Sequence, residues 1–319
     1  MNDAAADAVV VERRGCSTDS LMIVTEPTRN PRMRDSYSCT RTGMLKADVM
    51  PHTPIGRTIA FVAVAVAFSW AQWLAVIASQ RGWLAAHVSL GPLAIFGPLV
   101  AAVVILRGSD DRRRWWRSLL QWRMPPGIAF VAVFLSPVVF IGCLVIATAV
   151  MPGTPRVEAP PARSVAAVLA GMYLTAGVGE ESGWRGFLLP ELRTLVGPLV
   201  GSLIVAIVWF AWHLPLFWVA GATQQQISPF SFALGILSYS FILTWLVESA
   251  GNSTVPAMLF HTSANVTFWV AIVSVRHLPQ YGFVSRAYLG AMAACGAVAA
   301  TSLLCRERKA KRLAAQQGG

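Results

Sequence analysis

The chain has 319 residues, of which 55% are hydrophobic and 13% are charged. Soluble domains carry about 25% charged residues, so this composition excludes an ordinary soluble domain and indicates a protein embedded in a membrane. The net charge of +11 would suggest nucleic-acid binding in a soluble protein. Here most basic residues lie in two tails and one loop, where membrane orientation explains them better, and we expect no nucleic-acid partner.

The chain divides into three parts in order. Residues 1–54 are polar, mixed in charge and without a sustained apolar period, so we expect a disordered cytoplasmic tail. Residues 55–306 form the expected transmembrane domain, and residues 307–319 form a basic cytoplasmic tail.

Eight hydrophobic stretches follow the first tail, each near the ~20 residues that a bilayer requires. They cover residues 58–78, 88–106, 128–150, 163–180, 199–220, 230–248, 254–274 and 287–305. The sequence therefore predicts an all-α polytopic membrane protein with about eight transmembrane helices.

Basic residues gather in the first tail, in the loop after the second span and in the last tail. In an eight-span array these three segments lie on one side, so both termini are expected to be cytoplasmic in a multi-pass protein of the cell membrane. The loop interleaves arginines with aromatic residues, from Arg112 to Arg123. That pattern predicts a short helix lying in the interface against anionic lipid.

The fourth span ends in Gly-Glu-Glu-Ser-Gly-Trp-Arg-Gly, residues 179–186. Carboxylates at membrane depth are costly, so they usually face a polar interior and usually have a function. On a helix, Glu181 and Arg185 are four residues apart and can pair, while Glu180 points about 100° away and stays free. A cluster of charges reaching into the lipid headgroups would be the simpler interpretation.

Two later spans also carry polar groups. Trp209 and His213 are four residues apart in the fifth span, and His261 and Asn265 are four apart in the seventh, so each pair shares one helix face. Three separate spans therefore place carboxylate, imidazole or amide groups at membrane depth, which favours a common polar intramembrane site.

The motifs Glu180-Glu181-x-x-x-Arg185, an aromatic residue four before His213, and His261-x-x-x-Asn265 resemble, in this order, those of the CPBP intramembrane proteases. That family includes the type II CAAX prenyl endopeptidases and the bacterial Abi proteins. The resemblance covers a motif core at about residues 165–268. The family usually has Phe four residues before the first His, where this chain has Trp209, which fills a similar aromatic slot.

The resemblance implies an intramembrane endopeptidase that hydrolyses a peptide bond near the membrane surface. It assigns Glu180 as the base that activates water, with His213 helping to hold and polarise that water. His261 and Asn265 would stabilise the oxyanion through N–H donors, and Glu181 with Arg185 would be a supporting ion pair. The implied partners are a peptide or membrane-protein substrate and the lipid bilayer.

Two other functions remain open. One is a catalytically silent binding or immunity protein of the same fold, against which the retention of Glu180 and both histidines counts. The other is a proton-coupled transporter with these groups as a relay, against which the lack of recognisable inverted repeats counts.

Glu180, His213 and His261 are also the ligand types of catalytic zinc sites. However, the two histidines lack close spacing, and Asn265 is a poor zinc ligand but a good N–H donor. No acidic residue lies near His261 in sequence to accept from its second ring nitrogen. We therefore expect a metal-free, glutamate-based mechanism with no obligatory cofactor, and zinc as the alternative.

The depth of His213 stays open at this point. If the fifth span begins at residue 199, His213 lies about 21 Å along it at ~1.5 Å per residue, too far to meet Glu180 directly. Either residues 190–197 already form a helix outside the core, or the fourth span continues past Glu181.

Overall fold

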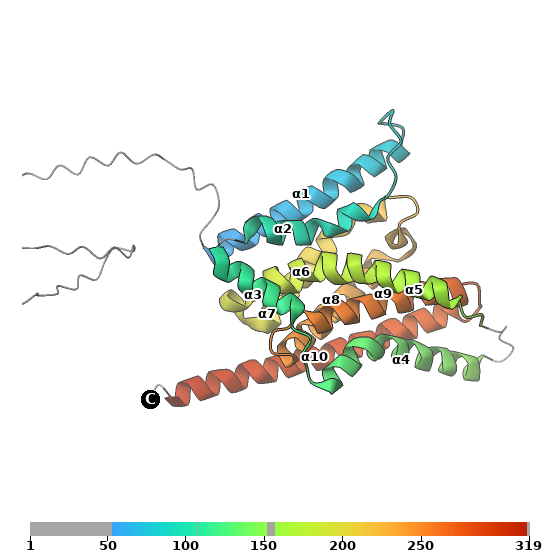
Figure 1. Cartoon of the computed structure of the whole chain (residues 1–319). Helices are drawn as coiled ribbons and strands as arrows, with labels where there is room; N and C mark the ends of the chain where they lie inside the picture. Colours follow the sequence, from blue (N-terminus) through green and yellow to red (C-terminus); the bar gives the residue numbers. More distant parts are fainter. Residues whose placement is uncertain (1–52, 107, 152–156, 318–319) are drawn as a thin grey trace, which may run out of the picture. The chain divides into compact units, whose positions relative to one another are not determined.

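The computed structural model describes residues 53–106, 108–151 and 157–317, and every regular element in these ranges is a helix (Figure 1). The longer separate helices are α1 (Pro54–Gln80), α2 (Gly97–Ile105), α3 (Gly108–Leu120), α4 (Pro126–Val150), α8 (Pro229–Ser249), α9 (Val255–Val275) and α10 (Tyr281–Gln317). A nearly continuous helical stretch contains α5 (Ala162–Met172), the π-helical η2 (Tyr173–Glu180), α6 (Glu181–Gly183), the π-helical η3 (Trp184–Leu188) and α7 (Leu189–Trp212). Short 3₁₀ turns are η1 (Pro92–Phe96), η4 (Leu214–Phe217) and η5 (Thr223–Gln226). The all-α prediction is confirmed; the predicted disorder of residues 1–54 concerns residues almost wholly outside the described ranges.

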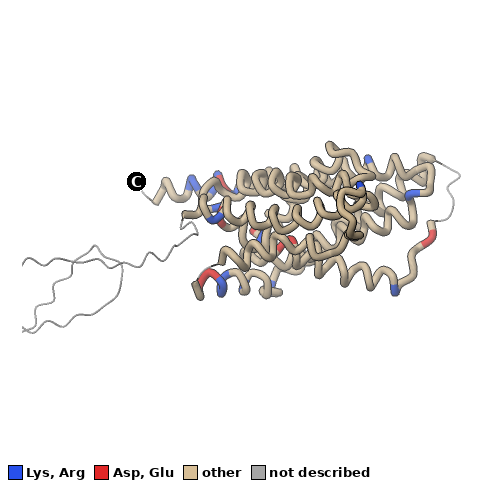
Figure 2. Tube along the Cα trace, turned by 90° about the horizontal axis from the view of Figure 1, so that it is seen from above, with Lys and Arg blue, Asp and Glu red and all other residues tan. Residues whose placement is uncertain are grey.

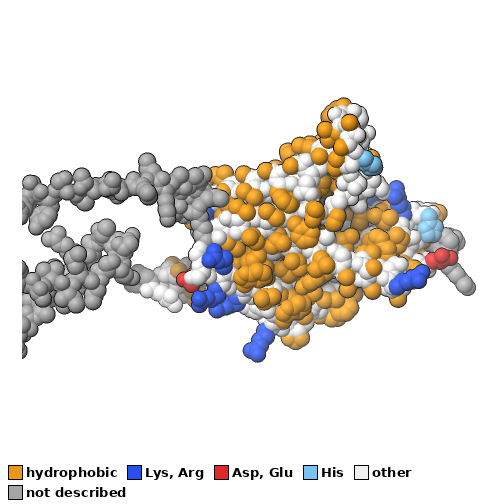
Figure 3. Space-filling view, turned by 45° about the horizontal axis from the view of Figure 1, so that its top comes forward, with side chains coloured by type: hydrophobic (Ala, Val, Ile, Leu, Met, Phe, Trp, Pro, Cys, Tyr) orange, Lys and Arg blue, Asp and Glu red, His pale blue; other side chains and the backbone are white. Residues whose placement is uncertain are grey.

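Six helical stretches of the described chain are long and apolar enough to cross a membrane, and the chain is a multi-pass membrane protein. They are Pro54–Gln80, Pro126–Val150, Ala162–Trp212, Pro229–Ser249, Val255–Val275 and Tyr281–Gln317, with a shorter apolar helical stretch at Pro92–Ile105. Large hydrophobic side chains cover the middle of the face in Figure 3, and the charged side chains gather towards its ends. Such a surface suits contact with lipid.

The count of six differs from the eight spans expected from the sequence, for two reasons. The expected second span is represented by the short stretch Pro92–Ile105. The expected fourth and fifth spans fall within one stretch of 51 residues, which consists of two helices that meet at Gly197, with Pro190 inside the first of them.

A glycine turn divides that long stretch. Gly197 has φ +82° and ψ 168°, outside the helical region, and Pro198 follows it. L-residues with a side chain rarely adopt this φ, so glycine is the residue that fits the turn. Beyond it the Leu199 N–H donates to the Glu307 carboxylate of α10 at 2.8 Å, which satisfies an otherwise unpaired donor at a helix start. The chain thus reverses at Gly197, and Gly201 packs on Leu192 across the turn.

Helix α9 is the most enclosed of the spans, with α4, α8 and η2 packed against it. Helix α8 in turn packs against α7 and α10, and α1 packs against α2 and α7 (Figure 1). The helical stretch that carries the charged motif at residues 179–186, here called the motif helix, meets the start of α2 at Gly183. A Cβ atom at Gly183 would lie 2.4 Å from the backbone carbonyl group of Pro98. Only glycine permits this approach, so the charged motif is closed in by α2 on one side and α9 on the other.

Candidate active site

The charged motif lies where the helix changes its winding. The π-helical segment η2 ends at Glu180, α6 is a single turn that begins at Glu181, and η3 follows from Trp184. π-Helical turns insert an extra residue and occur frequently at functional sites. Both carboxylates of the motif are buried, Glu180 at 5% and Glu181 at 0% exposure.

Glu181 is held by two cationic or hydrogen-bonding partners. The Arg185 Nη1 atom donates to Glu181 Oε1 at 3.0 Å, with neither side chain exposed, so the expected ion pair is present. His261 of α9 also donates from Nδ1 to the same oxygen, at 2.8 Å. Glu181 therefore joins the motif helix to α9 and orients the imidazole of His261, which leaves Nε2 as the available nitrogen of that ring.

Glu180 is in contact with Trp209, for which the sequence predicted only an aromatic role. The Trp209 indole Nε1–H donates to Glu180 Oε2 at 2.7 Å. The sequence suggested that this carboxylate is free, and in the structure it is hydrogen-bonded. The same indole ring lies 4.6 Å from the Arg185 guanidinium carbon and 5.1 Å from the His261 ring. Phenylalanine could supply the ring but not the N–H, so the departure from the family pattern changes the chemistry around Glu180.

His213 is the residue just after α7, and its ring is tied to the preceding turn. Nδ1 donates to the Trp209 backbone carbonyl at 2.8 Å, which fixes the tautomer and leaves Nε2 as the available nitrogen. The ring contacts Trp212 at 4.7 Å and Phe232 at 5.1 Å between centroids. It is 8% exposed, at the edge of the buried site.

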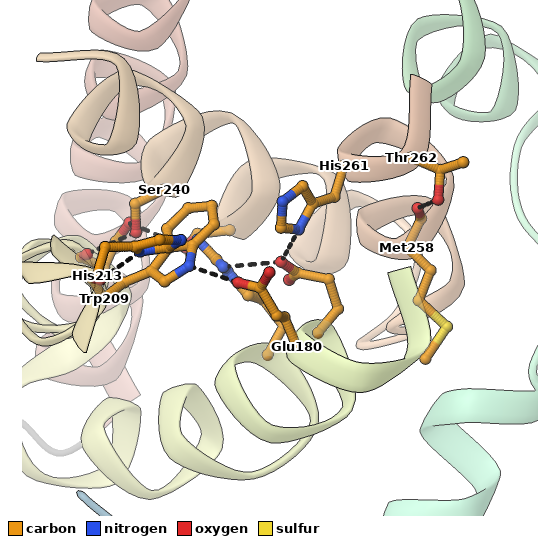
Figure 4. A network of polar contacts seen from close by, with 11 residues as sticks. Glu180, Trp209, His213, Ser240, Met258, His261 and Thr262 are labelled. Carbon is orange, nitrogen blue, oxygen red and sulfur yellow. Dashed lines mark hydrogen bonds and ion pairs between the residues drawn. The ribbon is translucent and has the colours of Figure 1, made fainter. Parts of the chain in front are cut away.

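The arrangement resolves how the two motifs approach each other. The helix continues past Glu181, as in the second alternative, then turns at Gly197 and returns as the second half of α7. That return brings Trp209 into contact with Glu180, and Figure 4 shows Glu180, Trp209 and His261 pointing into one space, with His213 beside Trp209.

Asn265 follows His261 by one helical turn on α9 and is half-buried. It forms no side-chain hydrogen bond to the other site residues in the described chain. The structure thus joins Glu180, Glu181, Arg185, Trp209 and His261 through direct contacts, connects His213 through Trp209, and leaves Asn265 at the margin.

The charges in the site do not balance. Two carboxylates face one guanidinium, and Arg185 is 1% exposed, so a negative charge remains in excess unless a proton sits on a carboxylate or a histidine. Glu181 Oε2 and Arg185 Nη2 have no hydrogen-bond partner among the described residues.

Glu180, His213 and His261 would be the ligands of a zinc ion in this site. No group of three or more His, Cys, Asp or Glu side chains in the described ranges converges as metal ligands would. The hydrogen-bond partner of Glu180 is the Trp209 N–H. One objection to zinc from the sequence is nevertheless wrong, because Glu181 supplies the acidic partner that His261 lacks in sequence. As placed, the residues do not fit a three-ligand zinc site.

One further contact was missed by sequence reasoning. The Trp115 indole N–H of α3 donates to the Ser182 carbonyl at 2.9 Å, next to the two glutamates. Helix α3 therefore touches the motif itself. Nothing in the spacing of the sequence signals this contact, since 67 residues separate the two positions.

Comparison with known proteins finds similarity in the segment that carries the site. Residues 162–267, which contain all the residues of the site, match the family model described as Type II CAAX prenyl endopeptidase Rce1-like. A curated relative, the CAAX prenyl protease 2 of Methanococcus maripaludis, is 32% identical over 101 residues. That match covers 30% of this chain and 37% of the relative. The segment that carries the site is therefore similar to proteases of the CPBP/CAAX type, and the chain spans well under half the length of the curated relative it matches.

Proposed function

We propose that the chain is an intramembrane endopeptidase in which Glu180 activates the attacking water. The observation that carries this proposal is the buried Glu180 carboxylate, which accepts a hydrogen bond from Trp209 through Oε2. A buried carboxylate that a water molecule can reach is a suitable general base. The match to the protease family supports the same reaction class.

In the proposed reaction Glu180 takes a proton from water as its oxygen attacks the carbonyl carbon of the scissile peptide bond. His213 receives a hydrogen bond from that water at Nε2 and holds it in line. The negative charge then develops on the carbonyl oxygen, where His261 Nε2–H and the Asn265 amide are the proposed donors. When the C–N bond breaks, the proton held by Glu180 passes to the leaving amine.

Glu181 and Arg185 act as positioning residues in this proposal. Nδ1 of His261 is already engaged with Glu181, so the ring can donate through Nε2 only when both nitrogens carry protons. The Glu181 carboxylate is the partner that such an imidazolium needs, and Arg185 holds that carboxylate in place.

The proposed substrate is a polypeptide at the membrane surface. The relative's name refers to prenylated CAAX sequences, which makes a lipidated peptide one candidate class for this chain. We also propose that both termini are cytoplasmic, because basic residues are concentrated in the two tails and in the segment of α3. In Figure 2 the basic residues of α3 and of the end of α10 lie at the same end of the helices.

The test is comparative proteomics of membranes from cells that carry the wild-type chain or Glu180→Gln. The matched control is Glu158→Gln, which removes an exposed carboxylate outside the site. We expect at least one membrane-associated precursor to accumulate uncleaved in the Glu180→Gln cells and to be processed in the wild-type and control cells.

A binding or immunity protein of the same fold predicts another result. In that case the Glu180→Gln protein would still bind its partner. The membranes of Glu180→Gln cells would contain the same protein N-termini as those of wild-type cells. Equal sets of cleavage products in the Glu180→Gln and wild-type cells, with equal amounts of folded protein, would refute the proposed function.

A further inference from the structure

Helix α3 has two faces with different surroundings. Trp115 and Leu119 are buried against the motif helix, and Gly186 of that helix packs directly on the Trp115 indole. On the opposite stripe Arg113, Trp116, Arg117 and Leu120 recur at helical spacing and are exposed, Trp116 at 53% and Leu120 at 64%. The helix thus presents a stripe of guanidinium, indole and aliphatic groups that nothing in the described chain covers.

The exposed stripe continues past the end of α3. Trp122 is 56% exposed and Arg123 is also exposed, and together with Arg117, Leu120 and Gln121 they line an open hollow. Within the described chain Asp111 pairs with Arg57 and Arg114, while Arg113, Arg117 and Arg123 form no ion pair. These three arginines keep their charge available for an outside anion.

The buried contacts of α3 join the two halves of the site. Trp115 donates to the carbonyl of Ser182, beside Glu180 and Glu181. At its other end the Ser118 carbonyl accepts from the Thr254 N–H at 2.8 Å, directly before α9, which carries His261. Gln121, which lines the hollow, donates to the Ala250 carbonyl and accepts from Ser253.

We propose that this stripe of α3 binds the headgroups of anionic phospholipids, and that the bound lipid stabilises the contacts of α3 with the motif helix and with residues 250–254. Along the chain α3 follows the apolar α2 and precedes the membrane-length α4, and a helix that joins two such segments is expected at the level of the headgroups. Exposed indole and leucine side chains are unfavourable in water but favourable in that layer, and arginines beside them attract anionic headgroups. Nucleic acid would meet the same arginines but would leave the apolar side chains in water. The lipid surface does not depend on the proposed protease activity.

The binding test uses the purified full chain in detergent and native mass spectrometry with added phosphatidylglycerol or phosphatidylcholine. Each basic residue near an anionic surface contributes about fivefold to affinity. We therefore expect wild-type protein to prefer phosphatidylglycerol by on the order of tenfold or more. The variant Arg113→Gln, Arg117→Gln, Arg123→Gln should lose most of that preference. The control Arg308→Gln, Lys311→Gln, Arg312→Gln removes three charges from the exposed end of α10 and should keep it.

The coupling test measures hydrogen–deuterium exchange in nanodiscs of phosphatidylcholine, with or without phosphatidylglycerol. We expect phosphatidylglycerol to slow exchange several-fold in the peptides that cover residues 115–121 and 250–254, in the wild-type and control proteins only. The single variant Arg117→Gln, with a partial loss, provides the same comparison if the triple variant folds poorly.

Equal affinity of the wild-type protein for the two lipids would overturn the proposal, as would a triple α3 variant that keeps the preference. Unchanged exchange at residues 250–254 despite lipid binding would overturn the coupling. Protection of α3 by an oligonucleotide at physiological salt, without any lipid preference, would assign the surface to nucleic acid instead.

Discussion

Removing the Glu181 carboxylate should destabilise the protein far more than removing a carboxylate from a partly exposed ion pair. In Glu181→Ala the Arg185 guanidinium keeps its charge at 1% exposure and loses its one ion-pair partner at 3.0 Å. Breaking one side of a buried pair typically costs about 3–5 kcal/mol, because an uncompensated charge stays in the interior. That corresponds to a shift of about 10² to 10³-fold or more in the unfolding equilibrium.

The neighbours of Arg185 do not compensate this loss. Its Nε and Nη2 atoms have no hydrogen-bond partner in the described chain, and its remaining close contact is the face of the Trp209 ring at 4.6 Å. His261 would also lose the acceptor of its Nδ1–H at 2.8 Å. By contrast, Arg193 and Glu248 form an ion pair at 3.0 Å with side chains that are 28% and 17% exposed. Glu248→Ala should therefore cost about 1 kcal/mol or less.

The assay is reversible unfolding in mixed micelles, with the free energy of unfolding measured for Glu181→Ala, Arg185→Met, Glu181→Met with Arg185→Met, and Glu248→Ala. The double variant should be less destabilised than either single variant, because it leaves no buried charge unpaired. A Glu181→Ala protein as stable as Glu248→Ala, or a double variant that shows the sum of the two single losses, would refute the buried ion pair.

Three further predictions address the indole, the metal and the topology. Trp209→Phe keeps the ring but removes the donor to Glu180, so the free energy of unfolding should fall by about 1.5–3 kcal/mol. In Trp209→Ala it should fall by about 3–5 kcal/mol, because this variant also leaves a cavity. A Trp209→Phe protein as stable as the wild type would contradict the hydrogen bond. Elemental analysis of active purified protein should find far less than one zinc ion per chain. About one zinc ion per chain, with activity lost to a chelator and restored by zinc, would contradict the metal-free mechanism. A reporter fused after Gly319 should be active in the cytoplasm, and activity confined to the other side of the membrane would reverse the proposed orientation.

The apolar spans and the pairing within each motif were predictable because they depend on local spacing. Hydrophobic stretches of membrane length gave the helices, and the separation of four residues gave the ion pair between Glu181 and Arg185. Both follow from helix geometry alone, which is the same wherever the helix lies.

The course of the chain between the two motifs was not predictable from the same rules. The sequence left open whether residues 190–197 are helical; in the structure Pro190 is helical directly after the π-helical η3, and the chain turns at Gly197. A wider turn relieves the clash and the missing donor that proline normally brings to a helix. For this reason the position of His213 relative to Glu180 could not be predicted from the sequence.

The partners of the site residues depended on packing between distant helices. Trp209 looked like a ring in an aromatic slot, but its N–H reaches Glu180 because the chain reverses at Gly197. His261 lacks an acidic neighbour in sequence, but α9 packs against η2 and brings Glu181 within 2.8 Å. Neither contact has a periodic signature, since the residues are 29 and 80 positions apart.

The central claim is that Glu180, His213 and His261 act together in peptide hydrolysis. The direct measurement is the cleavage rate, in proteoliposomes, of the precursor that accumulates in Glu180→Gln cells, for each single Ala variant and for the triple variant. Residues that act as one unit are strongly non-additive, so each single variant should lose nearly all activity and the triple variant should be hardly worse. A Glu180→Ala protein that folds normally and keeps most of its cleavage rate would contradict the account.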